Sequence, residues 1–564
     1  MDNSSLASSA FVALRPLTSS VGNNYEFLPS VNRLSSLSIF VISLGIFLAL
    51  TKSKIWLNKT GSPALSTYEK PLWYPHKDPI LGLDVLFDLA RAVYNHRFLE
   101  FTAEMISRFN GTITYLSLGR QAVYTVDPAN LHAMLSDRIR FKDFGHGPTR
   151  RQSLQPLFGS GIFNSDGAVW KKHRSTLRPM LSRVRTIEVD IFESHLQSLM
   201  QSVPADGSTV DLQPVFNAMA LDISTHLFLG TSTNVLPYLF NSDLRGMRGQ
   251  RFATAFDYSQ RAVSGIDDFS LSGLCWKLLF GDKKLDESLQ TIHSFIDEII
   301  EQASKNFLEE SRLPEFSDDK GQIFFYKLLG EGRSKEDIKH DILNLLLAGK
   351  DSTASFLASI WYVLCQRPDV CDKIRAEISP LQGQRPQLED LSKFPYLRMV
   401  LQEGKLEFPT SLEKLILRTP TVLRLYPPVA INQRTAEVDT FLPHGGGADG
   451  KSPLRVPRGA SVGYSVYAMH RLPEFFGEDA NEFRPERWLE NRQKTAYMPF
   501  HAGPRTCLGQ QLSMCLATYS TIRLLQYYER VENRNEKPWQ EKLGLNCTSR
   551  HGVKVALVVS RHAR

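Results

Sequence analysis

The chain has 564 residues, 42% of them apolar, and its 66 basic and 59 acidic residues give a net charge of +7. This composition is typical of a globular protein and excludes a disordered, collagen-like or coiled-coil chain. The six cysteines form no CxxC pair and like charges form no long block, so a disulfide scaffold, a Cys-rich zinc domain and a nucleic-acid-binding protein are not expected.

An uncharged apolar run lies near the N-terminus, from residue 34 to residue 50. It is just long enough to cross a bilayer as a helix. Arg33 precedes it, whereas Lys52, Lys54 and Lys59 follow it. The positive-inside bias therefore predicts a single-pass transmembrane anchor, with residues 1–33 in the lumen and the rest of the chain in the cytosol. A cleaved signal peptide and a buried core helix are the alternative interpretations.

A proline-rich segment follows this predicted anchor, with Pro63, Pro71, Pro75 and Pro79 close together. Proline favours extended backbone and prevents a continuous helix. We therefore expect a stiff tether over residues 51–79, followed by one large body over residues 80–564. No internal repeat and no second linker divides that body.

The predicted elements of the body are mostly helical. One helix is expected over residues 286–307, and a longer one begins at a capping box formed by Ser334 and Asp337 and ends at Gln366. Residues 426–473 differ, because short strand candidates flank a Gly-rich loop there. The fold class expected is mainly α with a small β part.

The strongest chemical signal is the stretch FHAGPRTCLG at residues 500–509. It leads directly into a predicted helix over residues 510–525, so Cys507 lies near a helix N-terminus. Backbone N–H groups and the positive end of the helix dipole favour a thiolate there. An isolated cysteine is more often a small buried hydrophobe, so the interpretation depends on the surrounding pattern.

That pattern, Phe-x-x-Gly-x-Arg-x-Cys-x-Gly, resembles the haem-ligand loop of the cytochromes P450. The five specified positions are Phe500, Gly503, Arg505, Cys507 and Gly509. The two glycines allow the chain to turn tightly and to approach a flat ligand, while the arginine can pair with an anionic group.

Three further motifs occur in the order that this resemblance implies, which extends over about residues 70–560. FRPERW at 483–488 resembles the family's Arg-bearing loop before the haem segment. AGKDST at 348–353 is similar to the family's oxygen-activating groove, with Ser352 where most members have threonine. WKKHR at 170–174 resembles the family's Trp-x-x-x-Arg helix. Its two lysines, Lys171 and Lys172, are expected to be solvated, with contact to an acidic redox partner as the alternative.

The resemblance implies a cytochrome P450 fold, a large helical domain with a small β-sheet part. It implies that Cys507 is the axial ligand of a haem b iron, and that Asp351 and Ser352 organise proton delivery during O–O cleavage. It implies haem propionate contacts from Arg174, Arg434, Arg505 and Trp170, and a structural role for Glu403, Arg424 and Arg487.

The electrons must come from a separate protein, since the chain has no convincing nucleotide or flavin motif of its own. The resemblance implies NADPH-derived electrons through a separate NADPH-cytochrome P450 reductase, O2 as co-substrate, and residence in the endoplasmic reticulum membrane with the catalytic domain in the cytosol. GIFNSDG at 161–167, PPV at 427–429 with Arg434, and YAMHR at 467–471 resemble fungal hydroxylases of n-alkanes and fatty acids. Members of the same family also act in secondary metabolism and in detoxification.

One segment interrupts the family's pattern. Members carry Glu-x-x-Arg on one helix, but here an 18-residue piece, Gly404 to Thr421, separates Glu403 from Val422 and Arg424. Removing the piece restores Glu-Val-Leu-Arg.

The piece has two interpretations. Gly404-Lys405 can be encoded by GGT AAG, which contains a splice-donor sequence, and Thr421-Val422 can be encoded by ACA GTG, which contains an acceptor-like one. A retained intron would then account for it. A genuine loop inserted into the helix is the alternative, and both Pro409 and Pro420 oppose a helical insertion.

Two rival functions remain at this level. A haem-thiolate isomerase or dehydratase would not need the acid and hydroxyl at Asp351 and Ser352, so their presence argues against it. A non-catalytic membrane haem protein is the second rival, and the split pair of Glu403 and Arg424 supports it.

Overall fold

The computed structural model describes residues 70–137, 139–182, 184–204, 206–240, 248–264, 281–310, 324–401, 421–489 and 496–559. The chain divides into two units, residues 1–63 and residues 64–564, and only the second contains described residues. The predicted anchor, the tether up to residue 69 and Glu403 with the insertion up to residue 420 lie outside them. Within the described ranges, no helix combines the length and the apolar character that a bilayer span requires.

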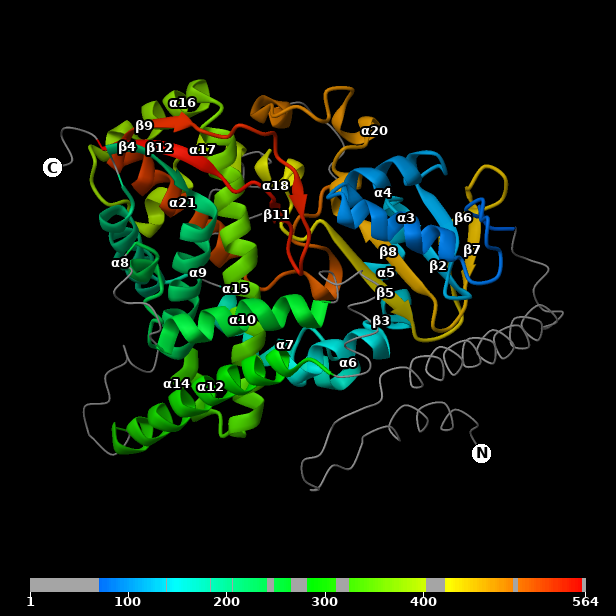
Figure 1. Ribbon diagram of the computed structural model, residues 1–564, viewed down its shortest axis with the longest axis horizontal. Helices are drawn as coiled ribbons and strands as arrows, with labels where there is room; N and C mark the ends of the chain where they lie inside the picture. The colour runs from blue at the N-terminus through cyan, green and yellow to red at the C-terminus, as the bar shows by residue number, and fades with distance from the viewer. Residues whose placement is uncertain are drawn as a thin grey trace, which may run out of the picture. The chain divides into compact units, whose positions relative to one another are not determined.

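Helices make up most of the second unit, as the sequence predicts (Figure 1). Their bounds are α3 Leu83–Tyr94, α4 Phe98–Ser107, α5 Pro128–Leu135, α6 Gly147–Phe158, α7 Gly167–Leu181, α8 Thr186–Ser202, α9 Leu212–Leu229, α10 Arg248–Ser264, α12 Lys283–Glu310, α14 Phe324–Gly330, α15 Lys335–Leu364, α16 Pro368–Ile378, α17 Pro395–Leu401, α18 Val422–Leu425, α19 Val466–Met469, α20 Pro473–Phe476 and α21 Gln510–Tyr527.

The strands form small sheets. Their bounds are β1 Thr112–Ser117, β2 Arg120–Thr125, β3 Phe144–Gly145, β4 Asp206–Asp211, β5 Ile431–Ala436, β6 Thr440–Gly446, β7 Ser452–Val456, β8 Ser461–Ser465, β9 Tyr528–Asn533, β10 Glu541–Lys542, β11 Thr548–Ser549 and β12 Lys554–Val559. The largest sheet has the order β1-β2-β8-β5-β3, and β6 and β7 form the hairpin predicted around the Gly-rich loop.

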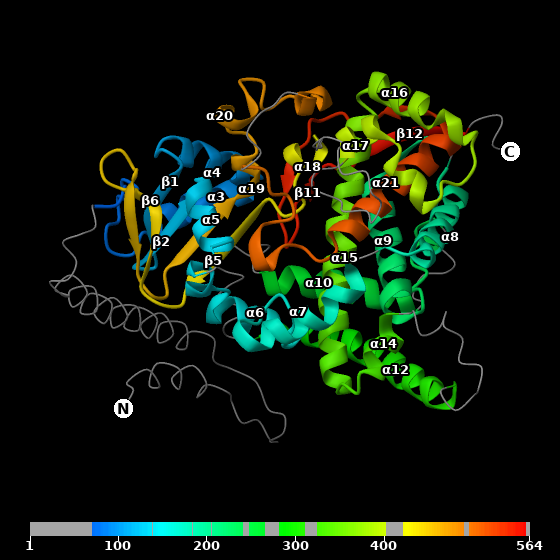
Figure 2. The same ribbon diagram turned by 180° about the vertical axis from the view of Figure 1, so that it is seen from behind.

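The long helix α15 is the centre of the helical part (Figures 1 and 2). It begins as the capping box predicts, because the Ser334 hydroxyl accepts a hydrogen bond from the Asp337 N–H at 3.1 Å. Side chains on all sides of its middle, including Ile342, Leu346 and Trp361, are fully buried. A helix that is apolar all round must lie inside the protein, and α9 packs along it.

The last ten residues of the predicted tether belong to the folded body. Their backbone is extended, and Pro71 and Trp73 form β-bridges with Gly446 and Thr114. The Tyr74 N–H donates to the Thr114 carbonyl at 2.8 Å. This part of the tether therefore docks on the sheet.

The two ends of the interrupted helix come together. α17 ends at Leu401, and α18 begins at Val422. The Thr421 N–H donates to the Met399 carbonyl at 3.2 Å, the bond that a residue at position 403 would make in a continuous α-helix. The helix thus resumes with Thr421 in the place expected for Glu403, although the sequence shows no cap for such a restart.

Candidate functional site

An internal cavity of about 300 Å³ lies between α9, α15, α21 and the loop that carries Cys507. Its walls are mainly apolar and include Phe163, Phe228, Ala348, Val429 and Leu545. These residues come from five separate parts of the chain, so only the tertiary fold assembles the cavity.

Cys507 lies at this cavity, at the end of a tightly folded loop. Its N–H donates to the Phe500 carbonyl at 3.0 Å. Gly503 has a φ of +71°, and a Cβ there would lie 1.8 Å from the Leu135 carbonyl oxygen, so only glycine fits. At Gly509 a Cβ would meet no atom closer than the Cys507 sulfur at 4.0 Å, so the space beside this glycine is open.

Opposing effects act on the pKa of the Cys507 thiol. α21 begins at Gln510 and the thiol lies close to its N-terminus, as predicted. However, burial raises the pKa of Cys507, and this outweighs the lowering by the Gly509 N–H and the Arg174 guanidinium. Cys507 is accessible to solvent and lines the cavity. A metal ion bound at the sulfur would favour the thiolate.

A group of cations lines one end of the cavity. Arg174 comes from α7, Arg434 from β5 and Arg505 from the cysteine loop, as the sequence predicts, and Arg150 from α6 joins them. Arg505 lies 4.4 Å from the centre of the Trp170 ring, and Arg174 lies 5.7 Å from it.

This cationic end has few anionic partners. Asp166 accepts from Arg505 at 2.5 Å, while Arg505 also donates to His146 at 2.9 Å. Burial and the neighbouring cations lower the pKa of Arg150 and of Arg505 to about 10, and that of His146 well below its usual range. The Nε atoms of Arg434 and Arg505 are buried without a hydrogen-bond partner among the described residues.

These observations fit a haem. The buried guanidinium groups at one end, two of which keep an Nε unpartnered within the described ranges, match its carboxylate side chains. The apolar walls match its ring, and Cys507 lines the same cavity. Arg150 and His146 were not predicted from the sequence, because a basic helix face is usually solvated. No spacing motif marks them.

The predicted catalytic residues Asp351 and Ser352 lie in different environments. Ser352 lines the cavity, and its hydroxyl donates to the Ala348 carbonyl at 2.6 Å. Asp351 does not line it; its carboxylate pairs with the buried Lys350, which also bonds Asp257 of α10 at 2.6 Å. The side chains of Asp351 and Ser352 therefore do not meet in the cavity.

Gly349 lies in the cavity lining where α15 meets α9. A Cβ there would lie 2.7 Å from the Ser224 hydroxyl and 3.3 Å from the Phe228 ring. The glycine therefore lets α9 pack closely against α15.

The predicted structural arginines, Arg424 and Arg487, do not line the cavity. Arg424 is fully buried and donates to the carbonyls of His470 at 3.0 Å and Glu482 at 2.9 Å. Arg487 pairs with Asp479 at 2.5 Å, while Glu403 lies outside the described residues. Burial, with Arg487 and Arg471 nearby, lowers the pKa of Arg424 to about 9.

Arg424, unlike Arg487, has no carboxylate partner within the described ranges. No acidic group there lies within ion-pair distance of Arg424, and the Nε atoms of Arg424 and Arg487 are buried without partners. Thr421 occupies the helical position one turn before Arg424, where a carboxylate would reach it.

Comparison with known proteins agrees with this geometry. The family model described as Cytochrome P450 matches residues 79–408 and 416–553. The unmatched residues between them, 409–415, lie inside the predicted insertion.

Fungal relatives match over most of the chain. Cytochrome P450 monooxygenase himC of Aspergillus japonicus is 33% identical over 531 residues, which cover 93% of this chain and 89% of the relative. Cytochrome P450 52A4 of Candida maltosa is 34% identical over 522 residues, covering 89% and 90%. Cytochrome P450 monooxygenase g430 of a Fusarium species is 35% identical over 484 residues, covering 82% and 80%.

The matched residues include both the cysteine loop and the helices around the cavity. The family carries a haem iron, uses O2 and electrons from a redox partner, and acts on hydrophobic substrates. Together, the geometry and the relatives show that the chain is a monooxygenase of the cytochrome P450 family.

Proposed function

We propose that this monooxygenase hydroxylates a long apolar chain, an n-alkane or a fatty acid. The observation that carries the proposal is the cavity, whose apolar walls end at the Cys507 sulfur. The resemblance of residues 161–167, 427–429 and 467–471 to fungal alkane and fatty-acid hydroxylases supports it. Among the relatives, Cytochrome P450 52A13 of Debaryomyces hansenii is 32% identical over 530 residues.

Each residue at the cavity would have its own role. Cys507 would ligate the iron of a haem b, which supplies the oxidising chemistry when bound. Arg174, Arg434 and Arg505, with Arg150, would bind its propionates, and Trp170 would orient Arg174 and Arg505 by ring contact.

The apolar walls would hold the substrate chain and exclude water. Phe500, Gly503 and Gly509 would shape the loop beneath the ring. An NADPH-cytochrome P450 reductase would supply electrons.

A chain-length screen tests the substrate. The purified holoenzyme is titrated with n-alkanes and fatty acids of increasing length, and the shift of the haem absorption band reports binding. A clear optimum at one range of chain lengths, followed by hydroxylated product with a reductase, would support the proposal. Binding of compact polycyclic ligands in preference to every linear one would favour secondary metabolism instead.

Ser352→Ala should lower the yield of product per NADPH consumed. The Ser352 hydroxyl is a polar group of α15 that lines the cavity and bonds the Ala348 carbonyl, and general acid–base assistance of this kind is worth about 100-fold or more. NADPH consumption itself should fall much less. Ser359→Ala, on the same helix but outside the cavity lining, is the control. Equal product yields for the parent and Ser352→Ala would remove the hydroxyl from the mechanism.

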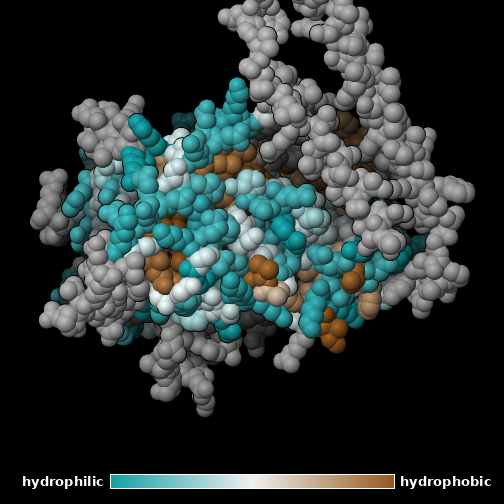
Figure 3. Space-filling model, turned by 90° about the horizontal axis from the view of Figure 1, so that it is seen from below, coloured by the Kyte–Doolittle hydropathy of each residue, from teal (hydrophilic) through white to brown (hydrophobic). Residues whose placement is uncertain are grey.

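Removing residues 1–52 should release the protein from integral membrane attachment. We propose that residues 34–50 anchor it in the endoplasmic reticulum, with residues 1–33 lumenal. Figure 3 shows a face on which hydrophilic residues dominate and hydrophobic ones form small patches.

Some peripheral attachment should remain, because Ile80, Leu83, Phe87 and Leu118 are exposed. Carbonate extraction of membranes distinguishes the two kinds of attachment. Full retention of the truncated form after carbonate treatment would contradict a single N-terminal span.

A further inference from the structure

The loop between α6 and α7, residues 159–166, forms one wall of the cavity. Ile162 and Phe163 of this loop line the cavity directly. Asn164 closes the turn, because its side-chain oxygen accepts from the Gly161 N–H at 3.0 Å. The Ser165 hydroxyl donates to the Gly161 carbonyl at 2.6 Å. The turn is therefore compact, and a shift of the turn would move Phe163 with it.

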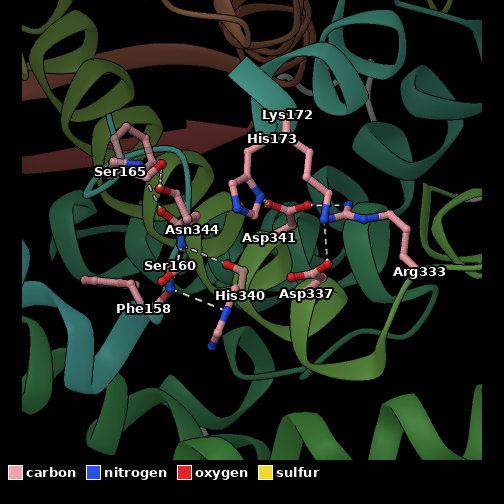
Figure 4. Close-up of polar contacts among 12 residues, drawn as sticks. Phe158, Ser160, Ser165, Lys172, His173, Arg333, Asp337, His340, Asp341 and Asn344 are labelled. Carbon is pink, nitrogen blue, oxygen red and sulfur yellow. Dashed lines mark hydrogen bonds and ion pairs between the residues drawn. The ribbon is translucent and has the colours of Figure 1, made fainter. Parts of the chain in front are cut away.

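A single buried amide on α15 holds this turn (Figure 4). Asn344 is fully buried, and its side-chain oxygen accepts from the Phe163 N–H at 3.2 Å. Its side-chain nitrogen donates to the Phe158 carbonyl at 2.9 Å and to the His340 carbonyl at 2.7 Å. The Asn344 side chain thus bonds the end of α6, the loop at Phe163 and its own helix.

The loop fits against this side chain only because it has glycines. A Cβ at Gly161 would lie 1.9 Å from the Asn344 side-chain nitrogen. At Gly159, which has a φ of +58°, a Cβ would lie 1.8 Å from the His340 ring. His340, one turn before Asn344, accepts from the Ser160 N–H at 3.3 Å. The sequence of the loop is therefore matched to two side chains of α15.

The helix α7 has its own attachment to α15. His173 bonds Asp341 at 2.6 Å, Arg333 pairs with the same carboxylate at 2.5 Å, and both His173 and Asp341 are buried. At the surface, Lys172 pairs with Asp337 at 3.0 Å (Figure 4). Loss of the Asn344 contacts should therefore release the loop while α7 keeps its place.

We propose that Asn344 is a positioning residue that sets the distance between Phe163 and the cavity face of α15, and thereby the length of apolar chain that the cavity accepts. The next turn of α15 supplies Leu347 and Ala348 to the cavity, so the amide joins two walls. An apolar residue at 344 would leave the part-buried Phe163 N–H without this partner, and the loop would relieve the loss by moving. The inference rests on the proposed function in taking the substrate to be an apolar chain.

The test uses the full-length holoenzyme and n-alkylimidazoles from butyl to dodecyl, which bind through the imidazole and extend the alkyl chain into the cavity. Dissociation constants are read from the absorption shift for the parent, Asn344→Leu, Phe163→Ala and the double variant. We expect Asn344→Leu to change the affinity of the longest probes by about tenfold and that of butylimidazole by less than about twofold. Ser359→Ala, which alters another buried polar side chain of α15, should change neither.

The double variant distinguishes positioning from a general structural effect. If Asn344 acts through Phe163, Asn344→Leu should have little further effect on chain-length preference once Phe163 is alanine. Independent, additive changes in the two variants would overturn the proposal, as would an unchanged chain-length profile in Asn344→Leu.

If Asn344→Leu does not incorporate haem, Phe163→Ala still tests the proposal. An unaltered chain-length profile in Phe163→Ala would by itself contradict a role of Phe163 in setting chain length. These affinities do not depend on the natural substrate. Failure of the alkane or fatty-acid assignment is detected separately, by the product assay.

Discussion

Cys507→Ala is expected to abolish both oxygen insertion and the red-shifted band of the reduced carbon-monoxide complex that a thiolate ligand gives. Alanine offers no sulfur, and no other cysteine of the described ranges lines the cavity. Cys507→His should lose the same band, because an imidazole is neutral and donates less electron density to the iron. Difference spectra and product analysis with a reductase measure the two effects.

Cys515→Ala is the matched control for this substitution. Cys515 lies on α21, two turns after Cys507, and burial raises its pKa to about 12. It does not line the cavity, so its removal should leave the spectrum intact. Retention of the thiolate band by Cys507→Ala would show that the axial ligand has been wrongly assigned.

Deleting Gly404 to Thr421 is expected to raise thermal stability and haem incorporation. The deletion joins Glu403 to Val422 and puts the Glu403 carboxylate where Thr421 now lies, one turn before Arg424. Leaving a buried charge unpaired costs about 3 to 5 kcal/mol, whereas the closure entropy of an 18-residue loop is on the order of 2 to 3 kcal/mol. The carboxylate should therefore matter more than the loop.

A second deletion, of residues 403–420, separates these two effects. It removes the same number of residues but keeps Thr421 in the helix. If the carboxylate stabilises Arg424 and Arg487, the version that retains Glu403 should melt several degrees higher. Thr421→Glu in the full chain should recover part of the gain.

Equal melting of the two deletions would mean that no buried ion pair forms. Equal haem incorporation and melting of the full chain and the first deletion would make the segment a tolerated loop and contradict the retained-intron hypothesis. Sequencing the transcript decides the origin of the segment independently.

Local signals in the sequence determined the long helix, the helix after Cys507 and the hairpin around residues 445–450. Each depends on contacts within a few residues: a cap at Ser334, a glycine before Gln510, and turn residues between two strands. The cysteine loop was recognisable for the same reason, since its ligand and its glycines are adjacent in the chain.

Only the tertiary structure decided how distant groups share space. It brought Arg150 and His146 to the cationic end, because α6 packs beside β5 across nearly three hundred residues of chain. It turned Asp351 toward Lys350, since a buried ammonium needs a nearby carboxylate. It also resumed the interrupted helix at Thr421. Burial and long-range pairing set these features, and neither leaves a spacing pattern that a single sequence reveals.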